Sequence, residues 1–114
     1  MVAVTKYAQV AILAAQYVKS GSSPINAWEK ASCEIFTPGS SMQKKGCPKK
    51  AFLGLYGQTS VNGGYAKKGL DYLKKHGSES ISPMKLWKIV TDGNGKTHNG
   101  QMDVVIALFD ANLI

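Results

Sequence analysis

Arginine is absent from this 114-residue chain, although it carries fourteen lysines against seven acidic residues and a formal net charge of +7. Arginine presents paired planar donors that read guanine edges and clamp phosphate, whereas lysine is a flexible, strongly hydrated point charge. A lysine-only surface can therefore hold a phosphate backbone but is poorly equipped to read bases. The excess charge predicts a polyanionic partner, although base composition of the genome accounts for the lysine bias equally well.

Long apolar runs and cysteines are also scarce. No stretch approaches the roughly 20 apolar residues that span a bilayer. Lys6, Gln9 and Gln16 interrupt the apolar N-terminal segment, which favours a core helix over a signal peptide. Two cysteines, Cys33 and Cys47, are too few for a disulfide framework. We therefore expect a cytoplasmic protein with reduced thiols and no membrane segment.

The usual catalytic and metal-binding signatures are missing. The two cysteines and two histidines lack the C-x-x-C or H-x-x-x-H spacing of a zinc site. The seven acidic residues include no close inward-facing pair of the kind that a glycosidase uses. The segment "GSSMQKKG" is not a phosphate-binding loop of the G-x-x-x-x-G-K-[ST] type. We expect no metal and no cofactor, and the sequence favours a binding protein over an enzyme.

Apolar residues recur at helical spacing along most of the chain. Three of the four prolines follow a small polar residue, Ser23, Cys47 or Ser82, where an N-cap and a proline at the first helical position would start a helix. The remaining glycine- and serine-rich stretches, including "QTSVNGG", are predicted loops. Helices are thus predicted over residues 4–19, 23–36, 47–57, 65–77, 82–90 and 99–114.

These elements predict one domain, residues 1–114, with an all-α fold: a compact orthogonal bundle of five to six short helices. A mainly α fold with one small hairpin near residues 87–98 is the alternative, because a glycine-rich turn lies there between partly apolar arms. The helical stripes predict inward-facing side chains, among them Ile25, Trp28, Met84 and Trp87.

The segment "KKGCPKK" surrounds Cys47 with Lys44, Lys45, Lys49 and Lys50. Its simplest interpretation is a helix start with solvated lysines. The same arrangement suits an anion or a nucleic-acid backbone, because free amides, the helix dipole and lysines point to one place. It also favours a thiolate and hence a reactive cysteine. Further lysine pairs that extend the anion-binding surface are Lys67 with Lys68 and Lys74 with Lys75.

A cysteine-dependent enzyme would need a base, and His98 is the candidate. The segment "HNGQMD" places His98 next to Asn99 and Asp103, which could orient its ring toward Cys47. Nothing in the spacing brings the two segments together. The simpler interpretation makes Asn99 the N-cap of the last helix and leaves His98 on the surface. His76, in "LKKHG", is predicted to be a cation at the C-terminal end of a helix.

The segments "SSPINAWEKA", "KKGCPKKAFLGLYG" and "HNGQMDVVIALFDANLI" resemble a family of short bacterial and phage-borne proteins of unknown function. The resemblance runs from about Ser23 to the C-terminus and is most specific in the stretch Gly-Cys-Pro-Lys-x-Ala-Phe-Leu-Gly-Leu. It implies that Cys47 and "HNGQMD" belong to one module, and it implies no activity. A small polar residue is expected where this chain has Gly100.

Three functions follow from these patterns. The first is a small basic helical binding module that contacts a nucleic-acid backbone or an acidic protein surface without strong sequence choice. The second is a protein-binding regulator or inhibitor of the phage or defence type. The third is an enzyme that depends on Cys47 and His98.

Overall fold

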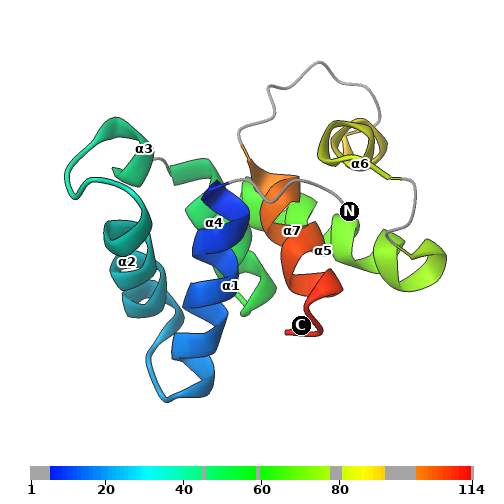
Figure 1. The fold of residues 1–114 in the computed structure, drawn as a ribbon. Helices are drawn as coiled ribbons and strands as arrows, with labels where there is room; N and C mark the ends of the chain where they lie inside the picture. Colours follow the sequence, from blue (N-terminus) through cyan, green and yellow to red (C-terminus); the bar gives the residue numbers. More distant parts are fainter. Residues whose placement is uncertain (1–5, 45, 59, 78–80, 92–99, 114) are drawn as a thin grey trace.

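The computed structural model describes residues 6–44, 46–58, 60–77, 81–91 and 100–113. These residues form the predicted all-α fold, and the Cα radius of gyration is 13.0 Å. A compact chain of roughly 100 residues has a radius of about 13 Å. Figure 1 shows short helices that cross one another, with α2 and α6 at opposite ends of the molecule. The helices are α1 (Lys6–Lys19), α2 (Pro24–Ile35), α3 (Ser41–Lys44), α4 (Gly46–Leu55), α5 (Val61–His76), α6 (Pro83–Val90) and α7 (Gln101–Asp110).

Both predicted serine–proline helix starts are confirmed. The Ser23 hydroxyl accepts a hydrogen bond from the backbone N–H of Asn26 at 3.3 Å, and Ser82 accepts one from Lys85 at 3.2 Å. In both helices proline occupies the first turn, where its missing N–H costs nothing. The predicted stop at Gly77 is also correct, because this residue caps α5 with a positive φ of 78°. Glycine is the residue that adopts such a conformation most readily.

The buried side chains form two clusters that share α4 and α7. The first joins α1 and α2 to these two helices around Trp28 and Phe52, and the second joins α5 and α6 to them around Leu73 and Trp87. Helix α7 therefore contributes to both clusters: Val104 belongs to the first, and other α7 residues belong to the second. This position explains why α7 is apolar around most of its circumference. The α7 residues in the second cluster are Met102 and Val105.

Helices α4 and α5 approach each other through glycine. A Cβ atom built on Gly54 would lie 2.2 Å from the Cα of Gly63, so neither backbone leaves room for a side chain. Gly63 lies in "QTSVNGG", which was predicted to be a loop. That prediction is wrong from Val61 onward, because Ser60 caps α5 by accepting a hydrogen bond from the Gly63 N–H at 2.9 Å. Of the two glycines that suggested a loop, Gly63 permits the close approach to α4, while a Cβ on Gly64 would meet nothing within 4 Å.

The start of α7 also depends on a glycine. Gly100, rather than the predicted Asn99, is the N-cap, and its φ of 87° lies in the left-handed region. Glycine adopts this conformation easily, because other residues carry a Cβ atom that is strained there. A Cβ on Gly100 would lie 2.9 Å from Cδ2 of Tyr7 and 3.5 Å from Cγ of Pro48. The starts of α1, α4 and α7 thus meet at this point, and a small polar residue would not fit there.

Some predicted burial is wrong at the ends of helices. Ile25 and Met84 were predicted to face the core, yet they are 43% and 52% exposed. Both are in the first turn of a helix, directly after the proline. The alternative hairpin near residues 87–98 is contradicted for its first arm, because Trp87 lies within α6. Residues 92–99 of that hairpin lie outside the described residues.

Candidate functional site

The segment "KKGCPKK" lies at the start of α4, but the helix does not begin at the predicted residue. Helix α4 begins at Gly46, so Cys47 is its second helical residue and not its N-cap. The Cys47 side chain is half-buried, and Pro48 behind it is buried. Lys44 is exposed at the end of the one-turn helix α3, and Lys50 is exposed on α4. Lys45 lies outside the described residues.

Lys49 is held by an acidic partner. Its ammonium nitrogen lies 2.5 Å from Oε1 of Glu29 on α2, and the Lys49 side chain is only 30% exposed. This ion pair fixes the start of α4 against α2 and places a carboxylate beside the predicted anion site. Lys49 therefore contributes less to an anion-binding surface than its sequence position suggests.

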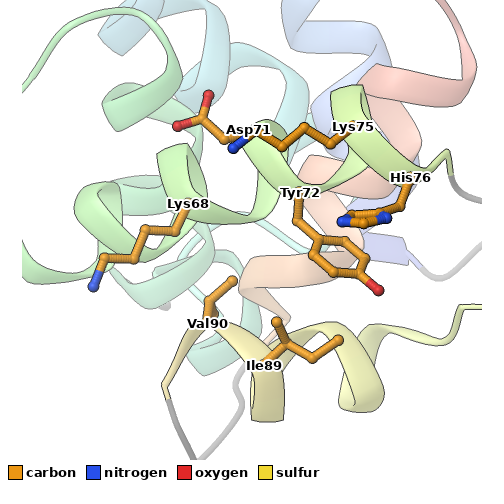
Figure 2. A pocket seen from close by; sticks show the side chains of 7 residues that line it. All are labelled: Lys68, Asp71, Tyr72, Lys75, His76, Ile89 and Val90. Carbon is orange, nitrogen blue, oxygen red and sulfur yellow. The ribbon is translucent and has the colours of Figure 1, made fainter.

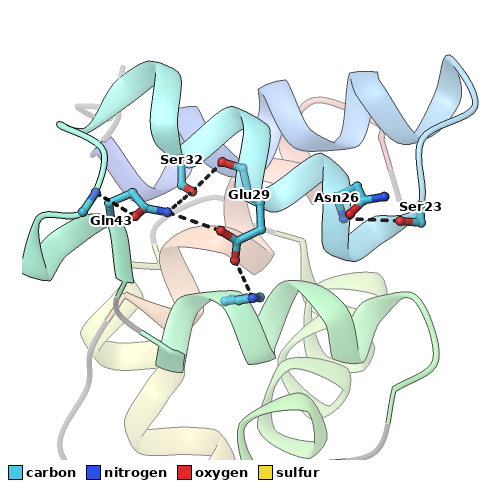
Figure 3. Close-up of polar contacts among 7 residues, drawn as sticks. Ser23, Asn26, Glu29, Ser32 and Gln43 are labelled. Atoms are coloured by element: carbon cyan, nitrogen blue, oxygen red, sulfur yellow. Dashed lines mark hydrogen bonds and ion pairs between the residues drawn. The ribbon is translucent and has the colours of Figure 1, made fainter.

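A buried glutamine completes the polar contact between these helices (Figure 3). The amide nitrogen of Gln43 donates to Oγ of Ser32 at 3.1 Å and to Oε2 of Glu29 at 3.5 Å. Its amide oxygen accepts the backbone N–H of Gly39 at 3.2 Å. Because Gln43 lies in α3, these bonds fasten the segment before α4 to α2. We call these hydrogen bonds of Gln43 the clip. They hold the "KKGCPKK" segment against α2 and so reduce its freedom to close around a ligand.

The residues of the predicted cysteine enzyme are only partly described. His98 and Asn99 lie outside the described residues, so the Cys47–His98 pair stays a prediction. Asp103 is half-buried in the first turn of α7. The proximity of Pro48 to Gly100 brings the residues that follow Cys47 and Asn99 close together, which neither the spacing nor the resemblance had required.

The other predicted lysines lie on α5. Lys67, Lys68, Lys74 and Lys75 are all exposed on this 16-residue helix, which has one acidic residue, Asp71. Lys74 and Lys75 are in the last turn with His76, where positive charge is favoured by the helix dipole. Among the described residues, α5 therefore has more exposed lysines than the start of α4.

Two of these lysines, Lys68 and Lys75, border a shallow groove between α5 and α6. Residues 68, 72 and 76 follow one another at spacings of four, and residue 75 is three positions after 72, so these residues lie along neighbouring rows on one side of α5. Helix α6 supplies the opposite wall. The groove has a volume of about 330 Å³. We call it the α5–α6 groove, and its lining residues are Lys68, Asp71, Tyr72, Lys75, His76, Ile89 and Val90.

Stacked rings form the aromatic part of the α5–α6 groove. The ring centroids of Tyr72 and His76 are 4.4 Å apart, and the ring planes meet at 35°. Figure 2 shows both rings pointing from α5 toward α6, with Ile89 pointing back at the tyrosine ring and Asp71 pointing away. Ile89 is 36% exposed, so the groove presents apolar surface to solvent.

Sequence reasoning missed the aromatic side of this groove. Tyr72 was assigned no role, and His76 was predicted only to be a helix-end cation. The sequence does contain a pattern that points to one helix face: Lys68, Tyr72 and His76 lie at four-residue intervals. It could not be interpreted without α6, because the wall that faces the rings comes from a separate helix further along the chain.

A family model matches residues 4–114, which is nearly the whole chain. The chain belongs to the family of unknown function DUF6979. No curated protein and no solved structure matches it. Membership in DUF6979 thus agrees with the resemblance to a family without an assigned activity, and the function has to be argued from the described surfaces.

Two further observations narrow the chemistry of this DUF6979 member. Within the described ranges, no group of three or more histidine, cysteine, aspartate or glutamate side chains could hold a metal ion. None of the described helices has both the length and the hydropathy that crossing a bilayer requires. The α5–α6 groove and the lysines of α5 are therefore the surfaces on which we build a function.

Proposed function

We propose that the protein is a small basic helical module that binds the backbone of a nucleic acid without strong sequence choice, mainly through α5. The observation that carries the proposal is the charge of this helix, with four exposed lysines against one aspartate. Lysine gives a mobile point charge that suits phosphate and gives no bidentate base contact. The start of α4 is a secondary contact, because Lys44 and Lys50 are exposed while Lys49 is paired with Glu29.

The position of the charge supports this assignment. Lys67 and Lys74 are seven residues apart on α5, which places them on one side of the helix and about 10 Å apart along its axis. Both are exposed. A rigid row of this kind can follow successive phosphates, and each neutralised phosphate releases a counterion. Binding of this type has a steep salt dependence and tolerates changes of sequence.

The test compares two double variants that remove the same charge. Lys67→Gln/Lys74→Gln alters α5, and Lys19→Gln/Lys30→Gln alters exposed lysines of α1 and α2. The affinity for a labelled duplex DNA is measured at several salt concentrations. We expect the α5 variant to reduce the steepness of the log–log plot by about 1.8, or about 0.9 per lost phosphate contact. The control should keep the original slope.

Equal slopes for the two variants would show that net charge alone governs binding and that α5 has no special role. Absence of duplex and single-strand binding at low salt would remove the proposed function altogether.

A protein partner, of the kind that a regulator or inhibitor has, is the second candidate. It is favoured by the exposed side chains of Met84 and Ile89 on α6, which are 52% and 36% exposed. Apolar residues near lysines suit an acidic protein surface that also carries apolar side chains. Capture of one stoichiometric protein and no nucleic acid from a host lysate, abolished in Met84→Ser/Ile89→Ser, would support this candidate over the first.

A further inference from the structure

The α5–α6 groove combines three features. It has a pair of stacked rings, Tyr72 and His76, a lysine, Lys68, at one end of the stripe, and an apolar wall that contains the partly exposed Ile89. Tyr72 also packs against the second buried cluster, so its ring position is fixed by the fold. The combination resembles the stacking platform and cationic path of proteins that bind single strands.

We propose that the α5–α6 groove holds one unpaired nucleotide, with its base against the Tyr72–His76 rings and its phosphate near Lys68. The inference rests on the proposed function and assigns the substrate class: a nucleic acid with unpaired bases. Every base has an aromatic face, so this contact adds affinity without sequence choice. That property agrees with a chain that has no arginine for reading base edges.

The accessibility of the base faces favours an unpaired base over a paired one. The groove has a volume of about 330 Å³. This value is at the lower end of the range for small-ligand pockets and is large enough for one base. In a duplex both faces of each base are already covered by neighbours. A strand with unstacked bases can instead place one base between the α5 rings and the α6 wall.

The charge around the groove favours a nucleotide over an acidic peptide. Figure 2 shows the Asp71 carboxylate and the Lys75 amine close together and pointing away from α6, while the Lys68 amine lies apart from both, so Lys68 is the lysine that is left for a phosphate. An amphipathic helix needs apolar anchors over several turns, whereas the aliphatic lining of the groove is Ile89 and Val90. The exposed Met84 is not among its lining residues.

The experiment follows the His76 ring by NMR during titration with three probes: uridine monophosphate, a twelve-residue deoxythymidine strand and a duplex of equal length. The chain has two histidines, so the His76 signal is assigned by its loss in His76→Leu. We expect the strand to shift the His76 ring signals, the mononucleotide to shift them at higher concentration, and the duplex to leave them nearly unchanged. Equal affinity for mononucleotide and strand would support the groove and identify a free nucleotide as its source.

Affinity measurements on ring variants give the second readout. Tyr72→Leu should weaken strand binding about fivefold to 150-fold, the ratio that corresponds to one stacked base at about 1–3 kcal/mol. Duplex binding and the salt slope should not change. Tyr17→Leu removes a tyrosine of α1 as the matched control, and His76→Leu, at an exposed position, covers the case in which Tyr72→Leu loses stability.

Strand binding that leaves the His76 signals and the Tyr72→Leu affinity unchanged would overturn the groove assignment while the proposed function stands. His76 shifts caused by a leucine-containing acidic peptide, and not by the strand, would also overturn it and assign the groove to a protein partner. If neither strand nor duplex binds at low salt, the proposed function fails together with the inference.

Discussion

The contact between Gly54 and Gly63 makes a quantitative prediction for Gly54→Ala. The new methyl group would lie 2.2 Å from the Cα of Gly63 and must move to at least 3.4 Å, so α4 and α5 must separate locally by about 1.2 Å. A gap of about 0.5–1 Å already removes about a quarter to a half of the dispersion energy across an interface. The two helices contribute Ala51 and Ala66 to the same buried cluster, so this loss falls on the core.

The expected magnitude follows from two opposing effects. Overpacking costs about 1–3 kcal/mol when flexible side chains can yield. More is expected here because the obstructing atoms are backbone. Alanine gains about 1 kcal/mol over glycine in a helix. We therefore expect Gly54→Ala to reduce the free energy of unfolding by about 2 kcal/mol or more, which lowers Tm by about 10 °C.

Urea unfolding measures this difference, and the chain supplies its own probes. Trp28 lies in the first buried cluster and Trp87 in the second, so tryptophan fluorescence reports on both. Gly64→Ala is the matched control, because Gly64 is in α5 and a Cβ there would meet nothing within 4 Å. The control should gain about 0.5–1 kcal/mol. A Gly54→Ala protein as stable as the unmodified one would refute the argument from close backbone contact.

Two further predictions concern polar contacts and pH. Gln43→Ala should cost about 1–3 kcal/mol in urea unfolding, because Ser32 loses a buried hydrogen bond and Glu29 loses a partly buried one. Gln16→Ala, at an exposed site of α1, should change the free energy of unfolding by less than about 0.5 kcal/mol; equal effects would contradict a stabilising role for the clip. At alkaline pH, tyrosines whose pKa is raised in the folded chain bind their protons more tightly there than in the unfolded chain. Their contribution to stability is therefore complete below the ordinary pKa of 10.0 and is lost as the pH rises through the raised pKa. Urea midpoints measured from neutral to strongly alkaline pH, together with ultraviolet titration of tyrosinate, test this, and a midpoint that does not fall above the ordinary tyrosine pKa would contradict it. Burial raises the pKa of Tyr7 and Tyr56, and the hydrogen bond to Glu34 raises the pKa of Tyr17.

The helix starts show how far local sequence reasoning reaches. Ser23 and Ser82 cap their helices as predicted, because capping joins residues only three positions apart. The same reasoning failed at Cys47, because the first helical residue is Gly46 and not the predicted Pro48. It also failed at Asn99, since the N-cap is the glycine that packs against Tyr7, a residue of a distant segment.

The candidate site divides in the same way. The sequence predicted that exposed lysines would be the main chemical feature, and the lysines of α5 and the start of α4 are indeed exposed where they are described, apart from Lys49. It did not predict that Glu29 would pair with Lys49, because that ion pair joins residues 20 positions apart. It also did not predict the role of Tyr72, since the groove exists only where α6 lies against α5.

The sequence by itself determined the all-α class, two serine-capped helix starts and the sign of the surface charge, because these depend on residue type and on contacts within one helical turn. Tertiary structure alone decided which lysines remain exposed, why Gly54 and Gly63 must be glycine, and where a ring pair meets an apolar wall. Those features depend on how helices from separate parts of the chain approach, and the free energy that sets their approach is spread over two buried clusters and not carried by any one segment.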